Sequence, residues 1–119
     1  MSTIFVFGSN LKGIHGAGAA KYAHENYGAE LGCGKGRTGN SYAIPTKITP
    51  YETLPLEAIN VFVNEFIKYA VDHPKDEFIL TAIGCGLAGY NPEQIAPMFS
   101  YTPSNVTLPR EFVEVLYDG

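Results

Sequence analysis

Apolar residues in this chain fall into two patterns, short continuous runs and one longer stretch with helical spacing. The runs Ile4–Phe7 and Phe78–Ile83 contain no charged residue, which is typical of strands that are buried on both faces. From Pro55 to Asp72, apolar residues recur at i, i+3 and i+4 spacing. This periodicity predicts a long amphipathic helix, and Pro55 fits its first turn because a missing N–H costs nothing there.

Shorter elements fill the rest of the chain. A stretch rich in small residues begins near Ala17 and predicts a helix, for which Gly28 gives a C-terminal stop. Asn91 and Pro92 form a further helix start, with Asn91 as N-cap and Pro92 at the first helical position. We therefore expect helices over 17–27, 91–100 and 110–117, and strands over 41–45 and 105–108, although residues 112–115 are also compatible with a strand.

The alternation of strands and helices predicts the fold class. It is typical of a single α/β domain, here residues 1–119, with a mostly parallel central sheet. Helices on both faces of that sheet would give a three-layer α/β/α arrangement. In such folds, ligands bind outside the carboxyl ends of the strands.

The composition narrows the range of partners. The 119 residues carry a net charge of −4 and no run of Lys or Arg, so no strong nucleic-acid surface is expected. The two cysteines, Cys33 and Cys85, are too few for a disulfide scaffold and lack metal-ligand spacing, so neither a metal nor a cofactor is expected. No apolar run reaches the roughly 20 residues of a membrane span, and the N-terminal residues lack a secretory pattern. These features predict a cytoplasmic protein with no membrane contact, and they leave the oligomeric state open.

The 13 glycines cluster rather than spread along the chain. One stretch, 8–20, follows the apolar run Ile4–Phe7, and a second, 84–90, follows Phe78–Ile83. Glycine lets backbone N–H groups approach a ligand closely and point at it, so such loops suit phosphate oxygens. Two of them at strand ends favour a nucleotide diphosphate as ligand. The plain alternative is that these glycines only make tight turns.

Other nucleotide and hydrolase motifs are not supported. Residues 34–39 match G-x-G-x-x-G, but they lie in a glycine-rich loop predicted over 28–40 and precede a strand, so they lack the strand–turn–helix context of a dinucleotide fingerprint. No G-x-x-x-x-G-K-[ST] sequence is present, and neither Ser9 nor Ser41 lies in a G-x-S-x-G elbow.

Two side chains within the glycine stretches are candidates for chemistry. Cys85 lies in the second stretch without an evident His partner, so it is either a nucleophile or a small residue that packs beneath the loop. His15 lies in the first stretch and is a candidate ligand contact.

The residues around both glycine stretches resemble the macro domain, a family of ADP-ribose-binding α/β modules. Asn10–Ala20 is similar to that family's asparagine, glycine-rich loop and helix, and Ile83–Tyr90 is similar to its second diphosphate loop. Gly16–Gly18, Thr46–Lys47 and the I-G-C-G-L of the second stretch further resemble the subgroup that removes ADP-ribose from glutamate side chains or from DNA, as does Pro50–Glu52. The pattern extends over about residues 4 to 99 and also resembles short macro-like proteins of phages and bacteria.

The resemblance implies catalytic roles for two residues. Lys47 would attack the anomeric carbon of the distal ribose and form an imine, and Asn10 would orient that ribose. The subgroup has an acid directly after its I-G-C-G-L, where this chain has Ala88, so the acid–base partner is absent or supplied elsewhere. The family's adenine-contacting aspartate has no counterpart either, because no Asp precedes Asp72. The structural alternatives are a solvated strand-end residue for Lys47 and a loop-capping residue for Asn10.

We therefore predict a macro-domain-like fold with a ligand crevice formed by loops 8–20, 32–40 and 84–91. The chain is expected to bind ADP-ribose or a related nucleotide diphosphate, free or on an ADP-ribosylated target, and as an enzyme to hydrolyse ADP-ribose from that target. The alternatives are a non-catalytic reader or sequestering module, a phosphatase acting on ADP-ribose phosphate, and an accessory protein that retains the fold alone. The catalytic candidates are Asn10 and Lys47, and the ligand-binding candidates are Gly8, Ser9, Gly13, His15, Gly16, Ala17, Gly18, Gly84, Cys85, Gly86, Leu87, Ala88, Gly89 and Tyr90, of which Tyr90 is expected to border the distal ribose.

Overall fold

A central strand carries buried residues on both of its faces, as its unbroken apolar run predicts. The structure, a computed structural model, describes residues 2–118. In chain order its elements are β1 (Thr3–Asn10), α1 (Gly18–Asn26), β2 (Gly36–Thr38), β3 (Ser41–Thr49), β4 (Glu52–Thr53), α2 (Leu56–Asp72), β5 (Glu77–Leu80), α3 (Pro92–Ile95), β6 (Val106–Thr107) and α4 (Arg110–Val113). A 3₁₀ turn, Ala96–Phe99, continues α3, and a π-helical turn, Glu114–Asp118, continues α4.

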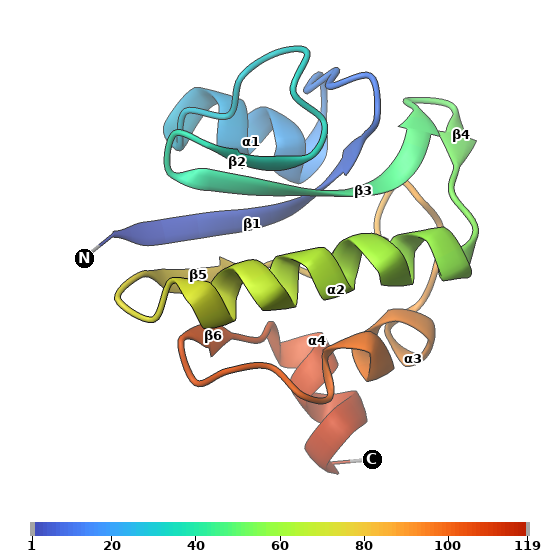
Figure 1. The fold of residues 1–119 in the computed structure, drawn as a ribbon. Coiled ribbons are helices and arrows are strands. Elements are labelled where there is room, and N and C mark those ends of the chain that lie inside the picture. The colour runs from blue at the N-terminus through green and yellow to red at the C-terminus, as the bar shows by residue number, and fades with distance from the viewer. Residues whose placement is uncertain (1, 119) are drawn as a thin grey trace.

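The strands of the described residues form one six-stranded mixed sheet in the order β2-β3-β1-β5-β6, with β4 paired to β3 (Figure 1). Strand β1 runs parallel to β3 and β5, and β5 runs parallel to β6, whereas β2 and β4 are antiparallel to β3. The sheet is thus mostly parallel, and the carboxyl ends of β1, β3 and β5 meet at one edge. Both glycine stretches follow strands of this set, so their predicted place at the carboxyl ends of parallel strands is confirmed.

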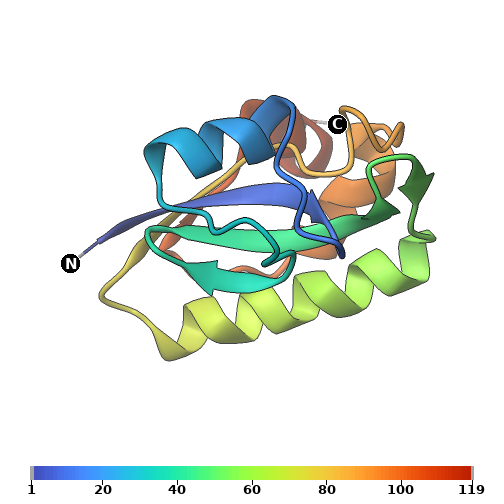
Figure 2. The ribbon, with the colours of Figure 1, turned by 90° about the horizontal axis from the view of Figure 1, so that it is seen from above.

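Successive residues of β1 face opposite sides of the sheet, and each side has its own core. On one side, Ile4 and Val6 pack in a cluster that includes Phe66 of α2 and Phe112 of α4. On the other side, Phe7 packs in a small cluster with Ala20, Ala23, Ala29 and Ala43. The alanines let α1 approach the sheet closely, and Figure 2 shows α1 and α2 on opposite sides of β1 and β3.

Most of the expected elements are present, and the differences have local causes. Strand β3 does not end at Pro45 but continues to Thr49. The expected strand Phe78–Ile83 ends at Leu80, and Ile79 is 43% exposed because Phe78 and Leu80 are the residues of β5 that face the core. The expected loop 28–40 contains the short strand β2. Residues 110–118 are helical, so the strand alternative for 112–115 is wrong.

Candidate ligand-binding site

A cavity of about 770 Å³ lies at the carboxyl ends of the parallel strands, within the ~300–1,000 Å³ range of small-molecule sites. Both glycine stretches and the end of β3 contribute to its walls. Of the predicted site residues, those that line it are Gly8, Ser9, Asn10, Gly16, Ala17, Gly18, Lys47, Gly84, Gly86, Leu87 and Ala88. The cavity therefore gathers, from three separate segments, most of the residues that sequence reasoning selected.

The first glycine stretch is held in shape by Asn10. Its side-chain Nδ2 donates to the carbonyl of Ile14 at 2.9 Å, and its Oδ1 accepts from the N–H of Ile14 at 3.1 Å. The N–H of Gly13 also donates to the carbonyl of Asn10 at 3.0 Å. Asn10 is buried, and its amide is engaged on both sides by the loop itself. These bonds agree with the structural alternative stated for Asn10, a side chain that caps the loop.

The second glycine stretch is a compact turn. The N–H of Gly89 donates to the carbonyl of Gly86 at 3.0 Å, and the N–H of Tyr90 donates to the carbonyl of Gly84 at 2.9 Å. Gly84 and Gly89 have φ values of +75° and +85°, a left-handed conformation that glycine adopts without strain. Thr53 of β4 donates its hydroxyl to the carbonyl of Ala88 at 3.2 Å, which joins this turn to the β3–β4 hairpin.

The two glycine stretches present backbone donors that no protein group uses. Within residues 2–118, the N–H groups of Gly16 and Ala17 in one stretch, and of Gly86, Leu87 and Ala88 in the other, donate to no protein acceptor. The first turn of α1, which follows directly, adds the N–H groups that a helix N-terminus leaves without a partner. Free donors of this kind, together with the helix dipole, create a positive potential that attracts anions.

A change of register in β3 brings Lys47 to the cavity. Ser9 of β1 pairs with Pro45, but Asn10 pairs with Lys47, so one residue of β3 is left over between them. Pro45 has no N–H for the ladder, and such positions in a sheet are typically associated with bulges. As a result, the adjacent residues Thr46 and Lys47 both line the cavity.

Lys47 gives the cavity its charge. It is half-buried, and its Nζ donates to the carbonyl of Pro50 in the β3–β4 turn. Among the described residues that line the cavity, Lys47 is the one with a charged side chain, and none is an Asp, a Glu or a His. The site therefore combines one cation with free backbone donors, which is an arrangement suited to an anionic ligand.

Several predicted ligand contacts are not among the residues that line the cavity: Gly13, His15, Cys85, Gly89 and Tyr90. His15 is buried beneath the first stretch, where its ring meets the edge of Phe7 at 5.5 Å and its Nε2 lies 3.0 Å from the carbonyl of Glu30. The hydroxyl of Tyr90 donates to the carbonyl of Leu54 at 2.6 Å. Both side chains thus support the loops through contacts with the rest of the protein and do not line the cavity.

Cys85 also packs against the core from its place in the second stretch. Burial raises the pKa of its thiol, and the carboxylates of Glu111 and Glu93 raise that pKa further. A raised pKa keeps the sulfur protonated near neutral pH, whereas a cysteine nucleophile needs the thiolate. The packing role proposed for this residue agrees with these surroundings.

The loop 32–40, expected to form part of the crevice, contributes no residue to the lining. It supports the first glycine stretch instead. The hydroxyl of Ser9 donates to the carbonyl of Gly34 at 2.5 Å, and a Cβ at Gly34 would come within 2.1 Å of the carbonyl oxygen of Asn10. Glycine is therefore required at position 34 for two backbone segments to pack together.

Several residues that line the cavity were not among the predicted ligand contacts, including Ile14, Thr46, Pro50, Tyr51 and Thr81, although Thr46 and Pro50–Glu52 carry part of the family resemblance. Tyr51 is 94% exposed at the tip of the β3–β4 turn, next to the cavity. Two signals were present. A proline inside a predicted strand indicates a bulge, and an exposed aromatic in a turn after that strand indicates a contact surface.

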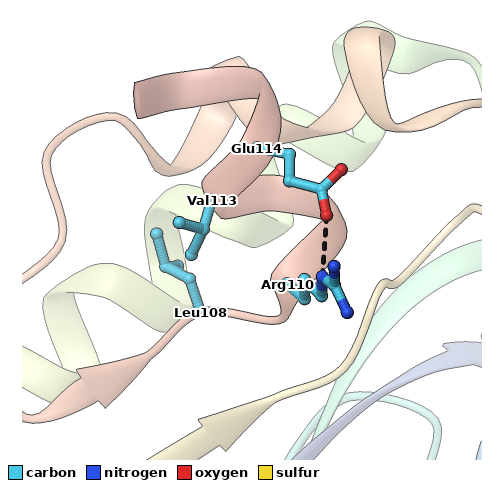
Figure 3. A pocket seen from close by; sticks show the side chains of 4 residues that line it. All are labelled: Leu108, Arg110, Val113 and Glu114. Carbon is cyan, nitrogen blue, oxygen red and sulfur yellow. Dashed lines mark hydrogen bonds and ion pairs between the residues drawn. The ribbon is translucent and has the colours of Figure 1, made fainter. Parts of the chain in front are cut away.

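A second hollow lies at the C-terminal end of the chain and has a different character (Figure 3). It is bordered by the side chains of Leu108, Arg110, Val113 and Glu114. Arg110 and Glu114 form an exposed ion pair with a separation of 2.9 Å between Nε and Oε1. With both charges paired to each other, the strongest polar groups of this hollow are already engaged.

No group of three or more His, Cys, Asp or Glu side chains in the described part of the chain is arranged to hold a metal ion. Over the same residues, no helix has the length and apolar character needed to cross a membrane. Comparison with known protein families, with curated proteins and with solved structures found no match for this chain.

Proposed function

We propose that the cavity binds ADP-ribose or a related nucleotide diphosphate, with the diphosphate held between the two glycine stretches. The observation that carries this proposal is the set of unpartnered N–H groups on both stretches, around one cavity whose charged side chain is Lys47. Phosphate oxygens are acceptors and carry negative charge, so they match both features. A three-layer arrangement like that of the macro domain is part of the same proposal.

Two glycines give independent support. Gly16 and Gly86 both line the cavity, neither has a positive φ, and a Cβ built on either would have no atom within 4 Å. The protein's own structure therefore does not require glycine at these positions. A ligand that approaches the backbone closely would require it, because a methyl group would stand in its path.

A second candidate function is the hydrolysis of ADP-ribose from a modified target. The observation that favours it is the pairing of Asn10 with Lys47 on neighbouring strands, so that both candidate catalytic residues line one cavity. In this version, the amine of Lys47 attacks the anomeric carbon of the distal ribose as the bond from that carbon to the target breaks. Water then hydrolyses the lysine adduct, which releases ADP-ribose and restores the amine. The proton needed by the leaving group would come from water or from the target, because the described lining offers no carboxylate.

The binding proposal is tested by calorimetric titration with ADP-ribose, ADP and adenosine. We expect saturable binding of ADP-ribose and ADP, and affinity for adenosine lower by about 100-fold or more, because adenosine forms none of the charge-assisted hydrogen bonds. Lys47→Ala should weaken ADP-ribose binding about tenfold. Lys35→Ala is the matched control, since Lys35 pairs with Glu65 on the surface and lies outside the cavity. Absence of binding by ADP-ribose and ADP, or equal binding of adenosine, would overturn the proposal.

The hydrolase version needs a separate assay. Single-turnover release of ADP-ribose from a modified glutamate peptide and from modified DNA is expected to be abolished by Lys47→Ala and unchanged by Lys35→Ala. Binding without release identifies the protein as a reader or sequestering module. Release that survives in Lys47→Ala removes the catalytic assignment of that lysine.

A further inference from the structure

Three apolar side chains at the mouth of the cavity are largely exposed to solvent. Ile14, Leu87 and Tyr51 all line the cavity, and they are 52%, 72% and 94% exposed. They come from three separate segments, which are the first glycine stretch, the second glycine stretch and the β3–β4 turn. We call these three side chains the apolar rim. Apolar side chains that gather around a pocket in this way are typical of an interaction surface.

Two members of the apolar rim are joined to the candidate catalytic residues. The backbone of Ile14 bonds both polar ends of the Asn10 side-chain amide. Tyr51 directly follows Pro50, whose carbonyl accepts a hydrogen bond from Nζ of Lys47. Since Asn10 and Lys47 pair on neighbouring strands, these contacts bring Ile14 and Tyr51 to the same end of the cavity.

Leu87 is connected to the same turn as Tyr51. The residue after it, Ala88, accepts a hydrogen bond at its carbonyl from the hydroxyl of Thr53 in β4. The apolar rim therefore lies at the end of the cavity that holds Asn10 and Lys47. In the proposed function the distal ribose lies beside these two residues, so a target joined to its anomeric carbon would leave the cavity past the apolar rim.

The charge at the mouth favours one class of target over another. Lys47 is the charged side chain among the described residues of the lining, and its Nζ is engaged by the β3–β4 turn. The charged residues nearest to the apolar rim in the sequence are Lys12, Glu52 and Glu93, all exposed, so the rim has no excess of positive charge. Nucleic acids need several cations along their phosphates, and the net charge of −4 opposes a polyanion. Apolar side chains of a polypeptide need no cations and gain free energy when they are buried.

We propose that the apolar rim is a docking surface for a polypeptide that carries ADP-ribose, and that it contacts apolar side chains next to the modified residue. This inference rests on the proposed function, since it assumes that the ADP-ribose part of the target occupies the cavity. It extends that function by naming the partner as a protein with apolar residues beside the modification, and not DNA.

The test compares free ADP-ribose with ADP-ribose joined through a non-cleavable triazole to three carriers. These are a peptide with leucine and phenylalanine beside the linkage, a peptide with glycine and serine there, and a DNA oligonucleotide. Calorimetry at one ionic strength should give a dissociation constant about tenfold lower for the apolar peptide than for free ADP-ribose, because burial of a large apolar side chain contributes on that scale. The glycine–serine peptide and the oligonucleotide should bind no tighter than free ADP-ribose.

Two exposed tyrosines provide matched variants. Tyr51→Ala should reduce the tenfold gain of the apolar peptide over free ADP-ribose to about threefold or less, since the platform for its side chains is lost. Tyr101→Ala, which removes an equally exposed tyrosine outside the described lining, should leave the gain intact.

Three results would overturn the inference and leave the proposed function standing. They are an equal affinity for the apolar peptide and free ADP-ribose, a gain that Tyr51→Ala retains in full, and an oligonucleotide that binds tighter than free ADP-ribose. Failure of both free ADP-ribose and ADP to bind would overturn the proposed function together with the inference.

Discussion

Two glycines of the supporting segment (residues 28–39) and two glycines of the cavity differ in what surrounds them. A Cβ at Gly34 would lie 2.1 Å from the carbonyl oxygen of Asn10, and one at Gly39 would lie 2.8 Å from the carbonyl oxygen of Gly28. A Cβ at Gly16 or Gly86 would meet no atom within 4 Å. Gly34 and Gly39 allow two backbone segments of the protein to pack together, whereas Gly16 and Gly86 leave space in which a ligand could approach the backbone N–H groups.

The difference shows why a count of glycines is a poor guide to a binding site. Residues 34–39 of the supporting segment match G-x-G-x-x-G, and so do residues 84–89 of the second cavity stretch. Nevertheless, no residue of the supporting segment lines the cavity. What distinguishes the cavity stretches is that they follow the parallel strands β1 and β5 and that their unpartnered N–H groups belong to residues that line the cavity.

The largest effect on stability is expected from a methyl group placed in the supporting segment. Gly34→Ala should lower the free energy of unfolding by about 3 kcal/mol, because the new Cβ meets backbone atoms that cannot rotate away. Denaturant titration measures this loss. An unchanged midpoint would show that the segment does not support the first glycine stretch as described.

High pH should lower the free energy of unfolding through Tyr42, which pairs with the supporting segment. Tyr42 lies opposite Arg37 of the supporting segment, and burial raises its pKa to about 12, with smaller contributions from Glu65 and Tyr69. The folded protein holds this proton more tightly than the unfolded chain, so the contribution is fully present below pH 10 and is lost as the pH rises toward 12. The loss should approach about 2–3 kcal/mol. In Tyr42→Phe the free energy of unfolding should fall less over that range, and an identical fall in both proteins would contradict the account.

A methyl group on a cavity glycine should weaken ligand binding without lowering the free energy of unfolding, unlike Gly34→Ala. Gly86→Ala is expected to leave the free energy of unfolding unchanged or to raise it by up to about 1 kcal/mol, since the Cβ has open space and φ is not positive. Its affinity for ADP-ribose should fall about tenfold, because the methyl group blocks approach to the N–H groups.

Gly32→Ala in the supporting segment is the matched variant. Gly32 also has open space, but its φ of +87° strains an alanine, so stability should fall by about 1 kcal/mol while affinity for ADP-ribose is retained. Equal effects of the two variants on binding would remove the distinction between cavity and supporting glycines.

The smallest expected effect concerns the rim of the cavity. Tyr51 and Tyr101 are almost equally exposed, at 94% and 92%, but only Tyr51 is among the described residues that line the cavity. Tyr51→Ala should weaken ADP-ribose binding about threefold through lost contact area, and Tyr101→Ala should leave it unchanged. Calorimetry of the two variants side by side checks this, and an equal loss in both would mean that the contact is not local.

The sequence predicted the order of the longer elements and the place of both glycine stretches because these depend on local periodicity and on strand direction, but it did not predict the short strands β2 and β4. It did not predict that β3 continues past Pro45, since the bulge depends on pairing with β1. Nor did it predict that His15 and Tyr90 face the protein interior, because their partners, the carbonyls of Glu30 and Leu54, are 15 and 36 residues away in the chain. Side-chain direction within a loop is set by such tertiary contacts and not by composition.

The central claim is that the unpartnered N–H groups of the two glycine stretches bind a diphosphate, and amide chemical shifts of the labelled protein during ADP-ribose titration test it most directly. The account predicts saturable shifts of the amides of Gly16, Ala17, Gly86, Leu87 and Ala88, with those of Gly36 and Gly39 in the supporting segment unmoved. Saturable shifts centred on the supporting segment, or none in the two stretches at saturating ligand, would contradict it.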